Sequence, residues 1–417
     1  MKTAGIQTWD VIVIGGGPAG MMAAARASAR GSRVLLLEKN PTLGKKLLIT
    51  GGGRCNVTNN RPVVREMLRQ YKDAGKFLFS TFMQHGVAET IAWFTERGAV
   101  LVEENEGRLF PSTHSAKTIF DTLKRELKTT GVTVKTRHAV KSIVKDLTTN
   151  ELVVTIERGD TFCGRTCIVA TGGTSRPETG ATGDGYQWLR KLGHTVIENN
   201  FALVPLTLKN NWVKKLSGLT LPDVKLTIYA EEKKDSVHRG KLLFTHVGVT
   251  GPTILNLSKT VGELLAHSDV TIVMDLFPDE DAGEFKKNLQ VLLQTNSNKK
   301  LRNALATILP TALVTALLEE MGIDGETPCH SVLKTDRIKL STHLKAVPLH
   351  VRGLLGADKA VIASGGVALP EVDFKTMESR LVPGLFLVGD VLNIDRPSGG
   401  YSLQLCWSTG FVAGEHV

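Results

Sequence analysis

Val11-Ile-Val-Ile-Gly-Gly-Gly-Pro-Ala-Gly20 is the stretch that decides the fold of this chain. Its four β-branched residues predict a buried strand that runs directly into glycines, followed by a tight turn and a helix. A second apolar run, Val34–Leu37, ends in Glu38, 18 residues after Gly20. The order of strand, Gly-x-Gly-x-x-Gly turn, helix, strand and acid is typical of a dinucleotide-binding unit and predicts an α/β, Rossmann-like fold.

The residues of this motif have separate roles at a bound dinucleotide. Gly15 permits the turn, Gly17 lets the backbone approach the pyrophosphate, and Gly20 lets the helix pack closely against the strand. The helix N-terminus at Pro18–Ala19 offers free N–H groups and a partial positive charge to the phosphates. Glu38 is expected to accept hydrogen bonds from ribose hydroxyls, which disfavours a ligand that carries a 2′-phosphate.

The composition is that of an ordinary globular protein. The chain has 417 residues, 42% hydrophobic and 22% charged, which is enough for two or three domains. No apolar run approaches the roughly 20 residues that a membrane span needs, and no signal-peptide pattern precedes the first strand. The five cysteines are few and scattered, and Cys163 and Cys167 lack a second pair of ligands. We therefore expect a cytoplasmic protein without a metal site.

The net charge of +10 is concentrated in the N-terminal third of the chain. Between residues 45 and 76, eight Lys and Arg residues stand against two acidic ones. If residues 62–72 form one helix, Arg65, Arg69 and Lys72 lie on one face of it. Such a face suits a polyanion such as RNA. A basic face that is merely solvated has the same composition, so this alternative stays open.

A second glycine-rich segment, Ile49–Asn59, follows the nucleotide motif. Three successive glycines would be costly in any regular element, but they suit a backbone that lies against a flat or anionic ligand. On this interpretation Arg54 pairs with a phosphate or stabilises a reduced, anionic flavin. Cys55 and Asn56 then face the reaction space. The alternative is a flexible loop.

Two later segments predict the rest of a nucleotide site. Residues 167–173 form a buried strand that enters glycines, and Gly180–Tyr186 is a further glycine-rich loop. Residues 384–390 form a strand that ends in Gly389-Asp390, an arrangement that places an aspartate on ribityl hydroxyls. A motif at residue 15 and a second half-site at residue 390 favour FAD over NAD as the cofactor.

The expected organisation is a discontinuous FAD-binding domain with two inserts. We assign residues 1–200 and 346–417 to the FAD-binding domain, residues 201–276 to a β-rich insert and residues 277–345 to a helical insert. Within the first segment, strands at 132–135, 139–146 and 152–157 are expected to form a small antiparallel piece.

Taken together, these blocks resemble the BaiN/RdsA (YhiN-like) family of NAD(P)/FAD-dependent oxidoreductases. The resembling stretches span nearly the whole chain: Gly15–Gly20, Ile49–Asn59, Gly107–Pro111, Ala170–Arg176, Gly180–Tyr186, Phe244–Pro252, Ser364–Val367 and Val388–Gly410. The resemblance implies the fold of two-dinucleotide-binding-domain flavoproteins and reduction by NAD(P)H. Some members are assigned as dihydrouridine synthases of large-subunit ribosomal RNA, and others reduce bile-acid intermediates.

The residues expected to serve this activity follow from the motifs and the resemblance. For catalysis we expect Cys55, Arg54 and His246, with Tyr401 and Cys406 as further candidates for the general acid. For the cofactor we expect Gly15, Gly17, Pro18, Ala19, Gly20, Glu38, Lys39, Lys46, Gly52, Gly53, Arg54, Cys55, Asn56, Val140, Ala170, Thr171, Gly172, Gly389, Asp390, Gly400 and Tyr401. Hydride would pass from reduced flavin to C6 of uridine, and the acid would protonate C5.

Three classes of function remain open from the sequence. The first is an RNA-modifying reductase, whose substrate would dock on Arg65, Arg69 and Lys72. The second is a small-molecule enone or steroid-type reductase that uses the same chemistry. The third is a non-catalytic flavin-binding protein. The sequence contains no second Gly-x-Gly-x-x-Gly motif for a nicotinamide nucleotide, so NAD(P)H is expected to dock transiently at the flavin.

Overall fold

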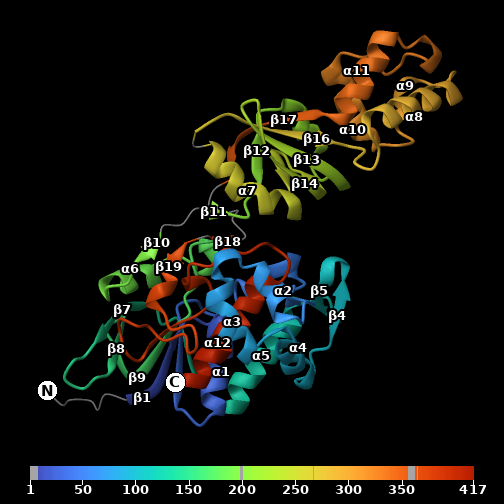
Figure 1. The fold of residues 1–417 in the computed structure, drawn as a ribbon. Helices are drawn as coiled ribbons and strands as arrows, with labels where there is room; N and C mark the ends of the chain where they lie inside the picture. Colours follow the sequence, from blue (N-terminus) through green and yellow to red (C-terminus); the bar gives the residue numbers. More distant parts are fainter. Residues whose placement is uncertain (1–7, 198–200, 266, 356–361, 364) are drawn as a thin grey trace. The chain divides into compact units, whose positions relative to one another are not determined.

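The computed structural model describes residues 8–197, 201–265, 267–355, 362–363 and 365–417 (Figure 1). Ser364 of the motif Ser364–Val367 and the N-terminal residues 1–7 lie outside the described residues. The chain forms two compact units, one made of Met1–Phe201 with Val361–Val417, the other of Ala202–Ala360. Each unit has its own hydrophobic core.

A seven-stranded sheet forms the centre of the first unit, in the order β6-β2-β1-β9-β8-β7, with β20 also paired to β9. Its strands are β1 (Thr8–Ile14), β2 (Val34–Glu38), β6 (Thr133–Thr136), β7 (Val140–Lys145), β8 (Leu152–Ile156), β9 (Thr161–Val169) and β20 (Leu385–Leu387). Strands β6, β2, β1, β9 and β20 are joined by parallel pairs, whereas β7 and β8 are antiparallel. The predicted α/β, Rossmann-like class is confirmed.

The small antiparallel piece differs in one strand from the prediction. Residues 133–136 do not join residues 140–145 but pair in parallel with β2, so β6 extends the main sheet. The antiparallel meander consists of β7, β8 and the first half of β9 instead. The exposed residues Thr133 and Val134 are typical of an edge strand, whose position depends on its neighbour and not on its own sequence.

Helices and short strands surround this sheet (Figure 1). The helices are α1 (Pro18–Ala29), α2 (Val64–Arg69), α3 (Gly75–Gln84), α4 (Val87–Glu96), α5 (Ala116–Thr130), α6 (Asp184–Lys191) and α12 (Tyr401–His416). The strands β3 (Thr58–Asn59), β5 (Arg108–Pro111) and β4 (Leu101–Glu104) form a small sheet, and β10 (Val196–Ile197) pairs with β19 (Gly366–Val367). The short strands β11 (Phe201–Ala202) and β18 (Ile362–Ala363) lie where the chain passes between the units.

The first and last helices of the chain pack against each other at very short range. A Cβ atom at Gly410 of α12 would lie 2.5 Å from the carbonyl oxygen of Ala19, and one at Gly414 would lie 2.5 Å from that of Ala23. Only glycine permits so close an approach of two helix backbones. The contact fixes the start of α1, where the nucleotide motif lies, against the C-terminal block.

The second unit combines a closed six-stranded barrel with helices. The barrel strands are β12 (Leu206–Leu208), β13 (Thr220–Ala230), β14 (Lys233–Phe244), β15 (Gly248–Thr250), β16 (Val270–Asp275) and β17 (Val347–Leu354). The helices are α7 (Pro252–Leu265), α8 (Ala282–Thr295), α9 (Leu301–Leu305), α10 (Thr311–Met321) and α11 (Lys334–Lys345). Buried side chains of the barrel and of α8 to α11 share one core, so the division into two inserts stays a prediction.

The predicted boundary at residue 346 is wrong by one strand. We expected the chain to return to the FAD-binding domain there, but β17 pairs with β16 and β12 and completes the barrel. Its buried residues Val347, Leu349 and Val351 alternate with more exposed ones, as expected of a barrel strand. The first unit therefore resumes at Val361.

Candidate functional site

A cavity opens at the carboxyl ends of β1 and β2 and the N-terminus of α1. Parallel α/β sheets bind their ligands at this edge. Twelve of the residues predicted to bind the cofactor line it: Gly15, Gly17, Pro18, Ala19, Glu38, Lys39, Lys46, Val140, Ala170, Thr171, Gly172 and Asp390. Segments that are up to 375 residues apart in the sequence therefore meet at one cavity.

The start of α1 is open toward this cavity. Gly17 is the N-cap residue, and no side chain caps the helix. A Cβ atom at Gly17 would meet no atom within 4 Å, so the space in front of the helix N-terminus is free. A Cβ at Gly20 would lie 1.9 Å from the carbonyl oxygen of Gly15, which is the close packing predicted for that position. This free space beside uncapped N–H groups fits a pyrophosphate.

Glu38 marks one end of the cavity. Its carboxyl group is buried, and one oxygen accepts a hydrogen bond from the backbone N–H of Gly16 at 2.7 Å. The other oxygen accepts from the backbone N–H of Asn40 at 2.7 Å. Nearby, Lys39 pairs with Asp184 at 2.7 Å. Two backbone contacts hold the Glu38 carboxylate in place, and its remaining lone pairs fit ribose hydroxyls.

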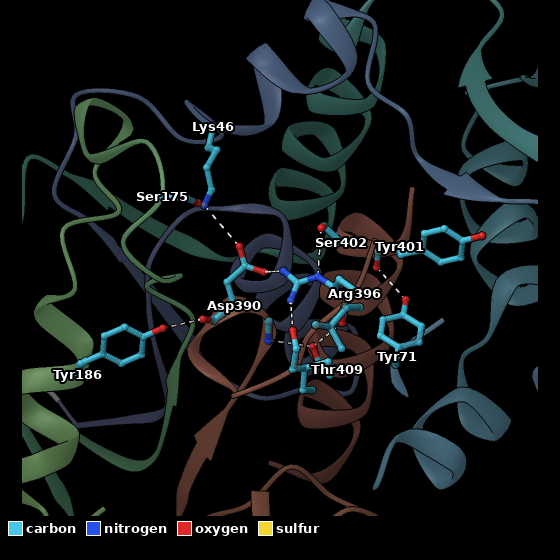
Figure 2. Close-up of polar contacts among 12 residues, drawn as sticks. Lys46, Tyr71, Ser175, Tyr186, Asp390, Arg396, Tyr401, Ser402 and Thr409 are labelled. Atoms are coloured by element: carbon cyan, nitrogen blue, oxygen red, sulfur yellow. Dashed lines mark hydrogen bonds and ion pairs between the residues drawn. The ribbon is translucent and has the colours of Figure 1, made fainter. Parts of the chain in front are cut away.

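Asp390 and Lys46 also line the cavity, and they contact each other (Figure 2). The ammonium group of Lys46 lies 3.4 Å from one carboxylate oxygen of Asp390 and 3.2 Å from the hydroxyl of Ser175. The other carboxylate oxygen accepts from Arg396. Burial acts to raise the pKa of Asp390, but the positive charges of Arg396 and Lys46 outweigh it and hold that pKa below its usual value. Asp390 therefore presents a carboxylate to the cavity at neutral pH.

Together, these parts of the cavity fit FAD. A pyrophosphate fits at the start of α1, with a ribose at Glu38 and the ribityl side at Asp390 and Lys46. Bound FAD would supply the redox chemistry. The polypeptide supplies the free N–H groups, the two fixed carboxylates and the ammonium group that would hold it.

The other predicted cofactor residues do not line this cavity. Gly20 and Gly389 lie directly behind it, against Gly15 and Ala19, and the rest belong to the glycine-rich loop and the start of α12: Gly52, Gly53, Arg54, Cys55, Asn56, Gly400 and Tyr401. Gly52 and Gly53 have positive φ angles of 68° and 85°, and Cβ atoms there would meet nothing within 4 Å. The oxygen of the Asn56 amide accepts from the backbone N–H of Gly400 at 3.1 Å. The hydroxyl of Tyr71 donates to the carbonyl oxygen of Tyr401 at 2.7 Å (Figure 2). The glycine-rich loop and the start of α12 are thus joined, and their contact with the cofactor stays a prediction.

Arg54 points away from the cavity in this structure. Its guanidinium group pairs with Glu104 at 2.7 Å and lies 4.2 Å from the ring centroid of Phe110. Both contacts lie in the small sheet around β4 and β5. The contact of Arg54 with a phosphate or a flavin stays a prediction.

The expectation that Cys55 faces the reaction space is wrong for this conformation. Cys55 has a positive φ of 62° and an exposed fraction of 0%, so protein atoms enclose its thiol in this structure. Burial raises the pKa of this thiol to about 12, although a hydrogen bond with Thr50 opposes the shift. The sequence could not show this, because burial depends on the long-range packing of the core to which Cys55 belongs.

Cys55→Ala is therefore expected to retain most of its turnover in an NAD(P)H oxidation assay with substrate. Loss of a general acid costs roughly 100- to 10,000-fold in rate, whereas a buried methyl-for-thiol change should cost less than about threefold. The control is the reactivity of the wild-type thiols, all five of which are buried and should react slowly at pH 8. A hundredfold loss of turnover in a folded C55A variant would restore the catalytic role.

The remaining candidates for the general acid differ in accessibility. His246 lies in the second unit, in an exposed position of the turn between β14 and β15, and its catalytic role stays a prediction. Cys406 lines the cavity, but burial raises the pKa of its thiol to about 12. Tyr401 is 5% exposed, and burial also raises the pKa of its phenol.

The predicted basic helix is shorter than expected. Arg65 and Arg69 lie exposed on α2, but the helix ends at Arg69. Lys72 follows in a turn with a positive φ of 49°, so it does not share the face of α2 by helical spacing. All three residues are exposed, together with Lys76 on α3. Within the described residues, no ion pair involves these four side chains.

Several cavity residues were not predicted as ligands. Asn40 stands two residues after Glu38, and the motif could have pointed to it. His138 lies in the turn before β7 and Trp188 lies on α6, and no motif marks either residue.

Among the described residues, no cluster of three or more His, Cys, Asp or Glu is arranged to hold a metal ion. No described helix combines the length and apolarity that crossing a membrane requires.

Comparisons with known proteins agree with this geometry. The family model described as "HI0933-like protein Rossmann domain" matches residues 9–416. "Ribosomal RNA dihydrouridine synthase" of Escherichia coli is 32% identical over 414 residues, which cover 99% of this chain and 98% of the relative. "3-dehydro-bile acid delta(4,6)-reductase" of Clostridium scindens is 28% identical over 405 residues, 96% of this chain and 97% of the relative.

Solved structures share the fold at low identity. A 3-ketosteroid-delta4-(5alpha)-dehydrogenase from Rhodococcus jostii RHA1 aligns with a TM-score of 0.53 and 13% identity, over 99% of this chain and 98% of that chain. A flavocytochrome c3 fumarate reductase aligns with a TM-score of 0.53 and 17% identity, over 99% of this chain and 78% of that chain. These likenesses show the fold alone. Since the family model and two relatives cover nearly the whole chain, the resemblance seen in the sequence is confirmed, and the protein belongs to the HI0933-like Rossmann family.

Proposed function

We propose that this protein is an FAD-dependent oxidoreductase that uses NAD(P)H to reduce an activated C=C bond. The observation that carries the proposal is the cavity at the start of α1, with free space at Gly17 and carboxylates fixed at Glu38 and Asp390. The full-length relatives support it, because one is named as a synthase of dihydrouridine and another as a reductase.

We infer further that the substrate is uridine in large-subunit ribosomal RNA. Relatives named "Ribosomal RNA dihydrouridine synthase" from Escherichia coli and Haemophilus influenzae are 32% and 29% identical over 99% and 96% of this chain. The exposed cations Arg65, Arg69, Lys72 and Lys76 support an RNA substrate, because phosphates need unpaired positive charges. Phe79 on α3 is 43% exposed and offers a surface on which an unstacked base can rest.

Residues 59–76 carry these cations and are called the basic segment. This segment contacts the start of α12. Tyr71, which lies between Arg69 and Lys72, donates to the carbonyl oxygen of Tyr401 at 2.7 Å. Asn59, at the other end of the segment, donates to the carbonyl oxygen of Gly399 at 3.2 Å. RNA bound to the cations would therefore lie on a segment that the fold anchors to the C-terminal block.

The deciding measurement is the dihydrouridine content of ribosomal RNA from cells that lack the gene, determined by mass spectrometry. We expect loss of dihydrouridine at one position and its return when the wild-type gene is supplied. An unchanged profile would contradict the RNA substrate. It would favour the second candidate, a small-molecule enone reductase, which the 28% identical bile-acid reductase supports.

Replacing the three cations in R65Q/R69Q/K72Q is expected to weaken RNA binding and its dependence on salt. Each lost phosphate contact to a single strand lowers the slope of log K against log [salt] by about 0.7, so the slope should fall by about 2. The matched control is K117Q/K124Q/K128Q, which removes three cations from α5 of the same unit. Equal slopes for the two variants would contradict docking on the basic segment.

A further inference from the structure

A buried arginine lies behind the acid that closes one end of the cavity. The side chain of Arg396 is 1% exposed, and its guanidinium group contacts a carboxylate oxygen of Asp390 (Figure 2). It also donates to the carbonyl oxygen of Ile394 at 2.6 Å and to the hydroxyl of Ser402, in the first turn of α12, at 3.1 Å. A buried guanidinium is costly unless its donors are satisfied in this way. Arg396 itself does not line the cavity, whereas Asp390 does.

Asp390 is held from two sides and by its backbone. Arg396 binds one carboxylate oxygen and Lys46 approaches the other at 3.4 Å. The hydroxyl of Tyr186 donates to the backbone oxygen of Asp390 at 3.0 Å, and the N–H of the preceding Gly389 donates to Thr409 at 3.0 Å. These contacts come from four separate segments. They fix the carboxylate in one orientation toward the cavity.

The charges around Asp390 are unequal. Two cations, Arg396 and Lys46, face one carboxylate, so this end of the cavity carries a net charge of about +1. The other titratable groups that face it, Tyr186, Cys406 and Tyr71, are neutral at ordinary pH because burial raises the pKa of each. Without Arg396 the carboxylate would keep only the more distant Lys46, and burial would favour its protonated form.

We propose that Arg396 is a positioning residue for the cofactor site, which keeps the Asp390 carboxylate ionised and aimed at the ligand. This inference rests on the proposed binding of FAD but not on the identity of the substrate. Arg396 touches neither the cavity nor its contents, so it acts through Asp390. Its side chain carries the charge, and its contacts with Ile394 and Ser402 set the direction from which that charge acts.

The test measures FAD affinity of the full-length protein, stripped of its cofactor, by fluorescence between pH 5.5 and 8.5. For R396M, the dissociation constant relative to wild type should be about tenfold higher at pH 8.5 and more than 100-fold higher at pH 5.5. The ratio rises as pH falls because, in R396M, the pKa of Asp390 is raised and its carboxylate is protonated at the lower pH. Taking the ratio to wild type cancels any pH dependence that the two proteins share.

Three further variants make the result specific. R396K keeps the charge and should restore a ratio that does not change with pH. In the D390N background, replacing Arg396 should add no pH dependence to FAD binding. The loss of FAD affinity in the double variant should be at least tenfold smaller than the product of the losses in the two single variants. R380M is the matched control, since Arg380 pairs with Asp373 at the surface of the same unit and should leave the ratio near one.

Two results together would overturn the proposal. The dissociation constant of R396M relative to wild type would not change with pH, and the loss of FAD affinity in the double variant would equal the product of the losses in D390N and R396M. Arg396 would then serve only the packing of the loop. Failure of the wild-type protein to bind FAD would instead contradict the proposed cofactor. Circular dichroism of each variant separates both outcomes from simple unfolding.

Discussion

Gly17→Ala is expected to fold like the wild-type protein and to lose at least about 100-fold in FAD affinity, which corresponds to about 2.7 kcal/mol. A Cβ atom at this position would meet no protein atom within 4 Å, so the fold has room for it. The same atom would project into the free space at the uncapped start of α1. Because phosphates bind by direct approach to the backbone N–H groups, even one methyl group there competes with the ligand.

The measurement compares FAD binding with stability in the same variant. An alanine at an N-cap costs about 1 kcal/mol of stability, which is too little to unfold a domain of this size. Gly353→Ala is the matched control, since a Cβ there makes only an ordinary contact of 3.7 Å with Thr207 in the second unit. Retention of wild-type FAD affinity by a folded G17A variant would show that the pyrophosphate does not bind at α1.

Trp407→Ala is expected to lower the free energy of unfolding of the first unit by about 4 kcal/mol. Trp407 has an exposed fraction of 0% and packs edge-to-face on Phe94, with ring centroids 5.2 Å apart. Its indole N–H donates to the carbonyl oxygen of Val57 at 2.9 Å. The substitution removes the largest fully buried side chain of the protein's described core and leaves the acceptor on Val57 without this partner.

Hydrogen exchange followed by mass spectrometry is the appropriate measurement, because the two units need not unfold together. Protection should fall in peptides of the first unit, above all around β3 and α12, and stay unchanged in the barrel of the second unit. Trp93→Ala serves as the control, since Trp93 is only partly buried and packs against Arg97 at the surface. Equal losses of protection in W93A and W407A would contradict the central role of Trp407.

The parts of the fold that could be predicted are those whose pattern is local. The strand, turn and helix at Val11–Ala29 are specified by adjacent apolar residues and by glycines that only one backbone path accommodates. The strand at 133–136 could not be placed in the same way. Four residues carry too little periodicity to choose a partner, and its pairing with β2 is decided by a neighbour almost 100 residues earlier. The boundary at 346 was misplaced for a similar reason, since the composition of β17 would suit a strand of either unit.

The candidate site divides along the same line. Gly17, Glu38 and Asp390 could be named because each stands at a fixed place in a recognisable motif. The burial of Cys55 and the pairing of Arg54 with Glu104 depend on contacts between distant segments, so the sequence misjudged the first and did not foresee the second. Arg396 lies inside the family-like stretch Val388–Gly410, but nothing in the sequence indicates its role. Only the structure shows that this cation faces Asp390 across six residues of chain.

The close packing of α12 on α1 has a consequence for synthesis of the protein. The ribosome makes α1 before the second unit and α12 after it, so α1 waits for its partner for roughly 20 to 70 s at ~5–20 residues per second. The second unit has its own core and all its strands within one continuous stretch, which allows it to fold during this interval. We therefore expect the inserted unit to be native first, while the nucleotide site stays incomplete until α12 has been made. During that time α12, with Gly410 and Gly414, is not yet available to cover α1. The apolar surface of α1 is then exposed and is a natural substrate for chaperones.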